Sequence, residues 1–368
     1  MELWHGPTSA FKDMALQIMP RLLSRALQKT GEKRTALILV ATSGDTGKAA
    51  LEGYKDVDQI KIKVFYPVDG VSKVQKLQMQ TQTGKNVDVT SIYGNFDDAQ
   101  TGVKKIFADE TIAAKLNEEN VFLSSANSIN WGRLVPQVAY YVSAYCDLVN
   151  MGKISLGEIV DVCVPTGNFG NIFAAYLAKS MGLPINKLIC ASNSNNVLTD
   201  FLETGVYDRN RKFYTTMSPS MDILISSNLE RLLYLICGSE KTASYMKELS
   251  QNGKYAVSAE ELNEIRKTFV GYFTSEDQCK AAIKKAYDEN GYLCDTHTAV
   301  GYHAALSYLK NTQENRFVIL ASTASPYKFA SSVYEALTGE KPKSDLSALS
   351  SLSDLTGTEI PLPLKDID

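Results

Sequence analysis

Between residues 35 and 122 the sequence alternates short β-branched and aliphatic runs with helical patterns, and this alternation constrains the fold more than any other feature. The patterns predict strands at residues 36–41, 60–66, 87–92 and 121–123, with helices near residues 46–55, 72–83 and 97–109. Strands that alternate with helices pair in parallel through right-handed crossovers. The segment therefore predicts an open, mostly parallel sheet that is flanked by helices.

A second region repeats this alternation after a long helical pattern at residues 134–149. The patterns there predict strands at residues 159–164, 188–192 and 317–321, with residues 269–273 as a candidate for one more. At 368 residues the chain has room for two α/β domains with a substantial core. The C-terminal residues from 344 onward show no clear period and predict a segment that wraps the surface or stays mobile.

Charge and cysteine usage narrow the class of protein. Lys and Arg number 38 and Asp and Glu number 41, so the formal net charge is −3, without the basic excess of a nucleic-acid or anionic-membrane binder. Six cysteines and three histidines show no spacing of metal ligands, so no metal is expected. No apolar run approaches membrane-spanning length and no basic-then-apolar leader opens the chain, which predicts a soluble, cytoplasmic protein with reduced thiols.

A lysine in a Gly/Pro turn is the strongest chemical signal. Lys12 stands in the string His-Gly-Pro-Thr-Ser-Ala-Phe-Lys-Asp at residues 5–13, just before an apolar helical pattern at residues 14–23. A rigid turn positions the amine, and lysine amines form Schiff bases with carbonyls such as that of pyridoxal phosphate (PLP). Taken alone, such a string more often marks a helix start with a solvated lysine. The other motifs of the chain therefore have to decide between the two interpretations.

Two glycine-rich turns each lie between a predicted strand and a predicted helix. They read Thr-Ser-Gly-Asp-Thr-Gly-Lys at residues 42–48 and Pro-Thr-Gly-Asn-Phe-Gly-Asn at residues 165–171. Turns of this kind direct backbone N–H groups and a helix N-terminus at an anion. The first is no nucleotide loop, because position 42 is not glycine and Ala49 follows its lysine, and the second lacks the G-x-G-x-x-G spacing. Both turns are candidates for binding another anion, although a turn like the second, taken alone, is usually just a connection between a strand and a helix.

Further strings add polar candidates. Residues 125–133 read Ser-Ala-Asn-Ser-Ile-Asn-Trp-Gly-Arg, and the guanidinium fork of Arg133 suits a phosphate dianion, although alone this string is more often a capped helix start. Residues 322–329 read Ser-Thr-Ala-Ser-Pro-Tyr-Lys-Phe and follow the last apolar run. Residues 218–223 and 295–301 are expected to open helices. For His297, in the second of these, a packed and hydrogen-bonded role is favoured over contact with substrate.

In this order the strings resemble the motifs of threonine synthase, from about residue 2 to 339. The resemblance implies the two-domain α/β fold of PLP-dependent fold type II, which is similar to that of the tryptophan synthase β-subunit. It implies a smaller domain with the substrate loops at residues 35–145, a larger PLP-binding domain at 1–34 plus 146–335, and a C-terminal tail at 336–368. The active site is expected at the carboxyl ends of the strands. Since threonine synthases carry a longer segment before the lysine motif, an N-terminally truncated sequence is expected.

The resemblance also implies roles for individual residues. Lys12 is the catalytic lysine, which holds PLP and then acts as the base at the substrate Cα. Thr323 offers its hydroxyl to the pyridine nitrogen, since Ser325 stands where many relatives carry histidine. The further cofactor-binding residues are Asp45 and, around the 5′-phosphate, Gly167, Asn168, Phe169, Gly170 and Asn171. The substrate-binding residues are Ser43, Thr46, Asn127, Ser128 and Arg133.

The implied reaction converts O-phospho-L-homoserine and water to L-threonine and phosphate, a step of threonine biosynthesis. Two alternatives stay open: a PLP-dependent phospho-lyase that eliminates phosphate without hydration and yields 2-oxobutyrate, and a PLP-binding fragment without turnover. A serine or threonine dehydratase is disfavoured, because it has no need of the phosphate site at Asn127, Ser128 and Arg133. The oligomeric state is open between monomer and homodimer.

Overall fold

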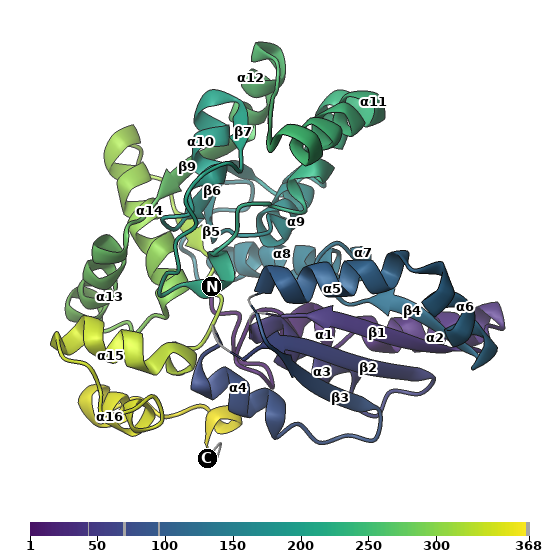
Figure 1. Cartoon of the computed structure of the whole chain (residues 1–368). Helices are drawn as coiled ribbons and strands as arrows, with labels where there is room; N and C mark the ends of the chain where they lie inside the picture. Colours follow the sequence, from purple (N-terminus) through teal and green to yellow (C-terminus); the bar gives the residue numbers. More distant parts are fainter. Residues whose placement is uncertain (43, 69–70, 95, 366–368) are drawn as a thin grey trace. The chain divides into compact units, whose positions relative to one another are not determined.

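Two four-stranded parallel sheets organise the chain, in a computed structural model that describes residues 1–42, 44–68, 71–94 and 96–365 (Figure 1). Each sheet is the centre of one compact unit. The unit named here the β1 unit comprises residues 3–136, 327–334 and 341–368, and the β5 unit comprises residues 1–2, 137–326 and 335–340. The parallel sheets with flanking helices confirm the predicted α/β class.

The sheet of the β1 unit has the strand order β3-β2-β1-β4, and all neighbouring strands are parallel. Its elements are α1 (Asp13–Leu16), α2 (Met19–Thr30), β1 (Thr35–Ala41), α3 (Asp45–Tyr54), β2 (Ile60–Pro67), α4 (Lys73–Gln80), β3 (Val87–Ile92), α5 (Phe96–Ala108), α6 (Glu110–Glu118), β4 (Val121–Ser125), α7 (Trp131–Leu134), α16 (Ser347–Thr356) and the 3₁₀-helix η3 (Leu362–Leu364). The four predicted strands of this region are confirmed.

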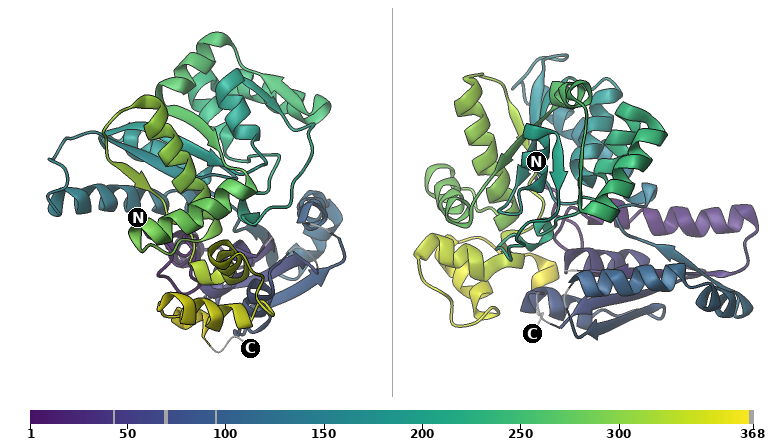
Figure 2. Two further views of the ribbon diagram at one scale, coloured as in Figure 1. Left: turned by 90° about the vertical axis from the view of Figure 1, so that its left-hand side faces the viewer. Right: turned by 45° about the horizontal axis from the view of Figure 1, so that its top comes forward.

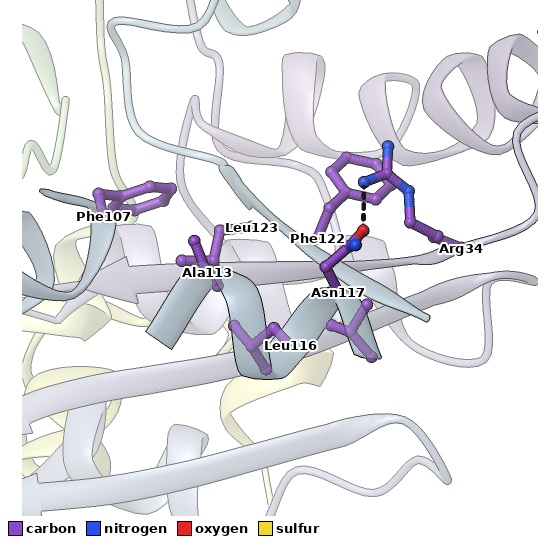
Figure 3. A pocket seen from close by; sticks show the side chains of 8 residues that line it. Arg34, Phe107, Ala113, Leu116, Asn117, Phe122 and Leu123 are labelled. Atoms are coloured by element: carbon purple, nitrogen blue, oxygen red, sulfur yellow. Dashed lines mark hydrogen bonds between the residues drawn. The ribbon is translucent and has the colours of Figure 1, made fainter. Parts of the chain in front are cut away.

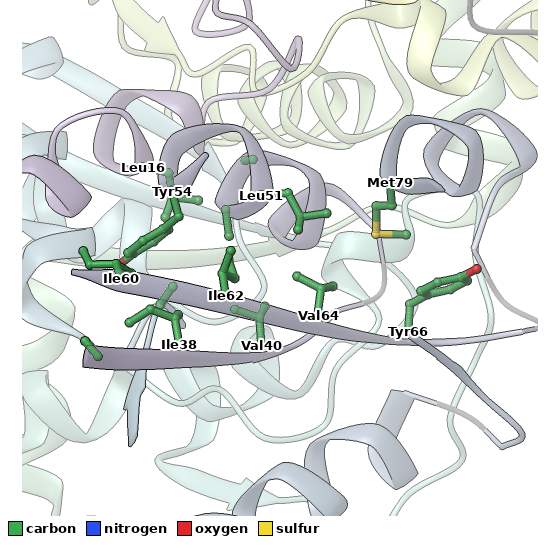
Figure 4. Packing of buried hydrophobic residues seen from close by; sticks show 14 of the residues in the cluster. Leu16, Ile38, Val40, Leu51, Tyr54, Ile60, Ile62, Val64, Tyr66 and Met79 are labelled. Carbon is green, nitrogen blue, oxygen red and sulfur yellow. The ribbon is translucent and has the colours of Figure 1, made fainter. Parts of the chain in front are cut away.

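The two faces of this sheet have separate cores, because successive strand residues point to opposite sides. The core on one face joins strands β1 and β2 to helices α1, α3 and α4 through Ile38, Val40, Ile62, Val64, Leu16, Leu51, Tyr54 and Met79 (Figure 4). On the other face Leu39 and Ala41 pack against Ala99 and Val103 of α5. Burial on both faces explains why β1 reads as a continuous apolar run.

The approach of α1 to α3 depends on a glycine. A Cβ added to Gly53 of α3 would lie 1.9 Å from the backbone oxygen of Leu16. We expect Gly53→Ala to lower the free energy of unfolding by about 1–3 kcal/mol, because one of the two helices must shift. Gly102→Ala in α5 is the matched control: a Cβ there meets nothing within 4 Å, and alanine stabilises a helix interior by about 0.5–1 kcal/mol. Thermal denaturation of both variants tests the contact, and equal melting temperatures would contradict it.

The helix predicted at residues 14–23 is interrupted. The structure has two helices instead, α1 up to Leu16 and α2 from Met19. Pro20 occupies the first turn of α2, and its ring and missing N–H are incompatible with the interior of one continuous helix. The break leaves α1 as a single turn whose first residue follows Lys12 directly.

The sheet of the β5 unit has the order β10-β5-β6-β9, again all parallel. Its elements are α8 (Pro136–Asn150), β5 (Val160–Pro165), α9 (Gly170–Ser180), β6 (Ile185–Ser192), α10 (Val197–Thr204), β7 (Val206–Asp208), η1 (Pro219–Met221), α11 (Leu229–Asn252), β8 (Lys254–Ala256), α12 (Ala259–Thr268), β9 (Phe269–Phe273), α13 (Glu276–Asn290), α14 (Thr296–Thr312) and β10 (Val318–Leu320). Helix α14, yellow-green in Figure 2, packs along all four strands. Two further elements, η2 (Pro326–Phe329) and α15 (Ala330–Thr338), follow β10.

One expectation for this part of the chain is wrong, and one helix was not foreseen. Residues 218–223 contain the 3₁₀-helix η1 (Pro219–Met221) and do not open an α-helix, since α11 begins at Leu229. The tail contains helix α16, in which Ala348, Leu349 and Leu352 share one buried face. Three apolar residues at this spacing are enough to dock a helix of ten residues, although they leave no long periodic signal in the sequence.

The contact-based units also divide the chain differently from the expected domains. Residues 3–34 belong to the β1 unit, because Leu16 and Leu27 are part of the core under β1 and β2. The expected boundaries had placed this segment with the PLP-binding domain, and as domain boundaries they stay a prediction. Over the described ranges, no helix is long and apolar enough to cross a membrane.

Candidate functional site

In each unit the predicted motifs lie at a topological switch point. In the β1 unit β2 and β3 extend the sheet on one side of β1 and β4 lies on the other, so the turns after β1 and β4 flank the reversal. In the β5 unit β10 and β6 flank β5 in the same way. Ligands of open α/β sheets bind at such points, outside the carboxyl ends of the strands. The described residues of these turns are 42, 44–46 and 126–133 in the β1 unit, and 166–171 and 321–325 in the β5 unit.

Lys12 lies directly before α1, at the end of a turn that Asp13 holds in place. The Asp13 carboxylate accepts hydrogen bonds from the backbone N–H of Thr8 at 2.8 Å and from its hydroxyl at 2.6 Å. A Cβ on Gly6 would lie 2.5 Å from the same carboxylate, so this position requires glycine. Ser9 in the turn has a φ of 58°, a strained conformation for a non-glycine residue that is enriched at functional sites.

The Lys12 amine is nearly buried and close to one carboxylate. Its side chain is 11% exposed, and its Nζ lies 3.9 Å from Oδ2 of Asp45. Burial lowers the pKa of Lys12 to about 8; Asp45 opposes this effect, and the positive charges of Arg133 and Lys328 add to it. An amine with such a pKa is partly neutral at physiological pH and can act as a nucleophile or a base.

Asp45 is the first residue of α3 and is buried. Burial would raise the pKa of its carboxyl, but the charges of Lys328 and Lys12 outweigh this effect and hold that pKa well below its usual range. The carboxylate is therefore ionised. Thr46, the next residue, is half-buried at the start of the same helix. Ser43, the third predicted residue of this turn, lies outside the described residues.

The turn after β4 contains the predicted substrate-phosphate residues. Asn130 caps α7 through a hydrogen bond from Gly132 N, so Arg133 lies in the last turn of this short helix. Arg133 is 3% exposed, and its Nη1 donates to the backbone oxygen of Ala126 at 2.6 Å. The Oδ1 atom of Asn127 is buried without a hydrogen-bond partner among the described residues, and Ser128 beside it is half-buried. A half-turn of the Asn127 amide would present an N–H donor there.

In the β5 unit the turn between β5 and α9 is fixed from both sides. Ser226 Oγ donates to the backbone oxygen of Gly167 at 2.8 Å, and Asn228 donates to that of Asn168 from its backbone N at 3.1 Å and from Nδ2 at 2.9 Å. Phe169 is buried with a φ of 61°, so a phenylalanine and not one of the two glycines adopts the left-handed conformation. The following Gly170 begins α9.

This turn fits a phosphate group. Because α9 begins at Gly170, its first N–H groups have no acceptor within the helix and carry the positive end of the helix dipole. The Asn171 side chain accepts hydrogen bonds from the hydroxyls of Tyr140 and Tyr141, while its buried Nδ2 has no partner among the described residues. A bound anion would accept from this donor. These features are the chemistry of a phosphate site at a helix N-terminus.

Thr323 lies in the turn after β10, next to a buried polar network. Its backbone N donates to Thr298 Oγ1 at 3.3 Å, and its own side chain is 6% exposed. In the same network His297 contacts Asp295 through Nδ1 at 2.9 Å and accepts a hydrogen bond from Ser220 N at 3.2 Å. His297 is thus packed and hydrogen-bonded, and the structural role favoured for it stays a prediction.

One cavity lies elsewhere in the β1 unit. It has a volume of about 340 Å³ and is lined mainly by apolar residues of α5, α6 and β4 (Figure 3). Arg34 at its rim stacks over Phe122 at 5.2 Å and donates to Asn117 at 3.0 Å. It contains none of the predicted site residues, so it is not the candidate site. In the described part of the chain no group of three His, Cys, Asp or Glu side chains is arranged to hold a metal.

Several contact residues escaped the sequence analysis. Lys328 forms an ion pair with Asp45 at 2.9 Å, although the motif at residues 322–329 carried no assignment for it. Gln75, Ser226 and Asn228 hold Asp45 and the turn after β5, and none of them lies in a quoted motif. The sequence does contain one indication that Lys328 is buried, because it stands between two aromatic residues, Tyr327 and Phe329.

Two protein families match the sequence. The family described as "Pyridoxal-phosphate dependent enzyme" matches residues 1–323, and the family described as "Threonine synthase, C-terminal" matches residues 298–361. The first match includes Lys12 and both glycine-rich turns, and the second begins inside α14 and includes Thr323 and Lys328.

Individual proteins agree with these matches. Threonine synthase-like 1 of Homo sapiens is 46% identical over 348 residues, which cover 92% of this chain and 46% of that protein. Threonine synthase of Saccharomyces cerevisiae is 40% identical over 361 residues, which cover 92% of this chain and 69% of that protein. The crystal structure of PLP-bound threonine synthase from Brucella melitensis superposes with a TM-score of 0.82 at 40% identity, covering 97% of this chain and 73% of that one. The superposition confirms the predicted fold type II, and the chain spans about half the length of the human relative.

Proposed function

This chain belongs to the threonine synthase family of pyridoxal-phosphate-dependent enzymes, and on this premise we propose that it converts O-phospho-L-homoserine and water to L-threonine and phosphate. The observation that carries the proposal is the nearly buried amine of Lys12, which follows a rigid turn and has a pKa lowered to about 8. Such an amine is suited to covalent attachment of an aldehyde and to proton transfer.

The residues present fit the cofactor of this family. Lys12 would hold PLP covalently, the turn at residues 167–171 would bind its phosphate, and the Thr323 hydroxyl would face its ring nitrogen. Two features support the phosphate assignment: Asn171 Nδ2 has no partner among the described residues, and the first N–H groups of α9 have no acceptor within the helix. When bound, PLP supplies an electron-withdrawing ring that stabilises negative charge on the substrate carbons.

The chain's own residues would handle protons and phosphate. Lys12 Nζ would remove the proton from the substrate Cα, which requires the neutral amine. Arg133, Asn127 and Ser128 would bind the substrate phosphate that leaves Cγ, and Ser43 and Thr46 would bind the substrate carboxylate. The buried guanidinium of Arg133 is already oriented by Ala126, so little side-chain entropy is lost on binding.

Product analysis tests the reaction. The purified chain, reconstituted with PLP and given O-phospho-L-homoserine, is expected to release threonine and phosphate in equal amounts. Release of 2-oxobutyrate and ammonia with phosphate would identify the phospho-lyase alternative. Binding of PLP without phosphate release would identify a fragment without turnover, and either result would overturn the proposed reaction.

The substitution Arg133→Lys tests the substrate assignment. Lysine keeps the charge but cannot hold Ala126 O and a phosphate with one planar fork, so we expect substrate binding to weaken by about 1–3 kcal/mol, or roughly 5–150-fold in kcat/KM. The affinity for PLP should stay unchanged, because the cofactor phosphate is assigned to the turn after β5. Steady-state kinetics and PLP titration give both values. Lost PLP affinity with intact substrate kinetics would mean that the two phosphate assignments are interchanged.

A further inference from the structure

A second buried lysine, Lys328, shares Asp45 with Lys12. Its side chain is completely buried, and its Nζ lies 2.9 Å from Asp45 Oδ1. The same nitrogen donates to the backbone oxygen of Thr8 at 2.9 Å and to Gln78 Oε1 at 3.3 Å. Three acceptors match the three N–H donors of an ammonium group. The Lys328 amine therefore has one acceptor for each of its donors and is held in place.

The carboxylate of Asp45 is oriented toward Lys328. Its Oδ1 accepts from Lys328 and also from Gln75 Nε2 at 2.8 Å. Gln75 is itself fixed, because its side chain completes the capping box of α4. It also packs closely against Gly44, where an added Cβ would lie only 2.5 Å from the Gln75 side chain. The second oxygen, Oδ2, lies 3.9 Å from Lys12 Nζ, which is beyond hydrogen-bond distance.

The two lysines thus lie at different distances from the Asp45 carboxylate: 2.9 Å for Lys328 and 3.9 Å for Lys12. The Lys12 amine lies 4.5 Å from the centre of the Phe11 ring, and its ion pair with Asp45 is a long one of 3.9 Å. The charged groups that act on it are Asp45 and Asp13, which are negative or titratable, and Arg133 and Lys328, which are positive. Burial raises the pKa of the Asp13 carboxyl, so Asp13 is more readily protonated than Asp45.

We propose that Lys328 is a positioning residue for Lys12: it binds the Asp45 carboxylate and so prevents a close ion pair between Asp45 and the Lys12 amine. The inference rests on the proposed function, in which Lys12 must be neutral to attach the cofactor and to accept a proton. Lys328 supplies the positive charge that stabilises the buried Asp45 carboxylate. Lys12 therefore does not have to be protonated to neutralise Asp45. The alternative is a purely structural ion pair that ties residues 327–334 to the turn before α1.

The two interpretations differ in the proton affinity of Lys12. Without the charge of Lys328, Lys12 is the one remaining lysine of the described ranges that pairs with Asp45, and its protonated amine is stabilised. We expect Lys328→Met to raise the pKa of Lys12 from about 8 by one unit or more. Each unit lowers the neutral fraction of the amine at pH 7 about tenfold. Capture of PLP should slow by the same factor at pH 7 and recover as the pH rises through the new pKa.

The experiment is an NMR titration of the full chain without cofactor. Lysine amines are dimethylated with ¹³C-formaldehyde, the Lys12 signal is assigned from its loss in Lys12→Arg, and its midpoint is compared between variants. Lys328→Met and Lys328→Gln should both shift the midpoint upward, and Lys328→Arg should restore it. Lys48→Met is the matched control, since Lys48 is a partly buried lysine of α3 that pairs with Glu52 and should leave the midpoint unchanged.

The Gln variant keeps a donor toward Asp45 and Thr8, so it provides the comparison if the Met variant does not fold. A folded Lys328 variant with lower thermal stability but an unchanged Lys12 midpoint would overturn the proposal and leave a structural ion pair. The titration contains no PLP, so its outcome is independent of whether Lys12 holds the cofactor. A wrong cofactor assignment would be detected separately, by covalent PLP in a chain that lacks Lys12.

Discussion

Replacing Lys12 by alanine is expected to abolish turnover, with a loss of more than about 10³-fold, because attachment of the cofactor and proton transfer at Cα are both assigned to one amine. Binding of PLP should become weaker but should persist, since the turn at residues 167–171 binds the phosphate independently of Lys12. The absorbance of the chain after dialysis and its mass after borohydride reduction measure the two effects. The covalent mass should be absent in Lys12→Ala and present in the wild-type chain.

Lys48→Ala is the control for this prediction, because it removes a lysine from α3 without touching the assigned site. Retention of a borohydride-fixed cofactor mass in Lys12→Ala would place the cofactor on another lysine. Lys328 is the first alternative attachment site to examine by peptide mapping, since it is the other lysine that pairs with Asp45 and is buried.

The second large effect is expected from Gly167→Ala. A Cβ at this position would lie 2.8 Å from the backbone oxygen of Ser220 and 3.3 Å from the Cα of Met221. The turn has to move, because residues 216–222 are themselves held by hydrogen bonds that converge on Asp222. We expect the affinity for PLP to fall by about 10–100-fold, or about 1.4–2.8 kcal/mol. Titration of the apo-chain with PLP gives the dissociation constant.

Gly182→Ala separates loss of cofactor binding from loss of stability. Gly182 follows the other end of α9, has a φ of 104° and has no atom within 4 Å of an added Cβ. Its replacement should destabilise the chain without moving the turn after β5. Equal losses of PLP affinity in both variants would mean that the turn has only a structural role.

The sequence predicted the strands well, because β1 and β5 are buried on both faces and need uninterrupted apolar runs. The predicted location of the site has a related reason, and it stays a prediction: the glycine-rich turns follow those runs directly, and parallel strands bring their carboxyl ends to one edge of a sheet. The helix break before Met19 also had a signal in Pro20. The individual roles of the site residues stay predictions until the variants above are measured.

The partner of Asp45 could not be predicted in the same way. Lys328 is far from Asp45 in sequence, and the residues around it resemble those of many buried turns. The affinity of a lysine for a proton depends on burial and on charges brought together by the fold, and no local pattern encodes that sum. For the same reason a sequence pattern could identify Lys12 but could not show which of two buried lysines is saturated.

The bond between Lys328 and Thr8 joins positions 320 residues apart, and this spacing has a consequence for biosynthesis. At translation rates of about 5–20 residues per second, the second position follows the first by roughly 15–60 seconds. During that interval the nascent chain contains Lys12 and Asp45 but not the lysine that separates them. With the role proposed for Lys328, a ribosome-bound chain that stops before residue 328 is expected to capture the cofactor more slowly at neutral pH, as the Lys328→Met variant is.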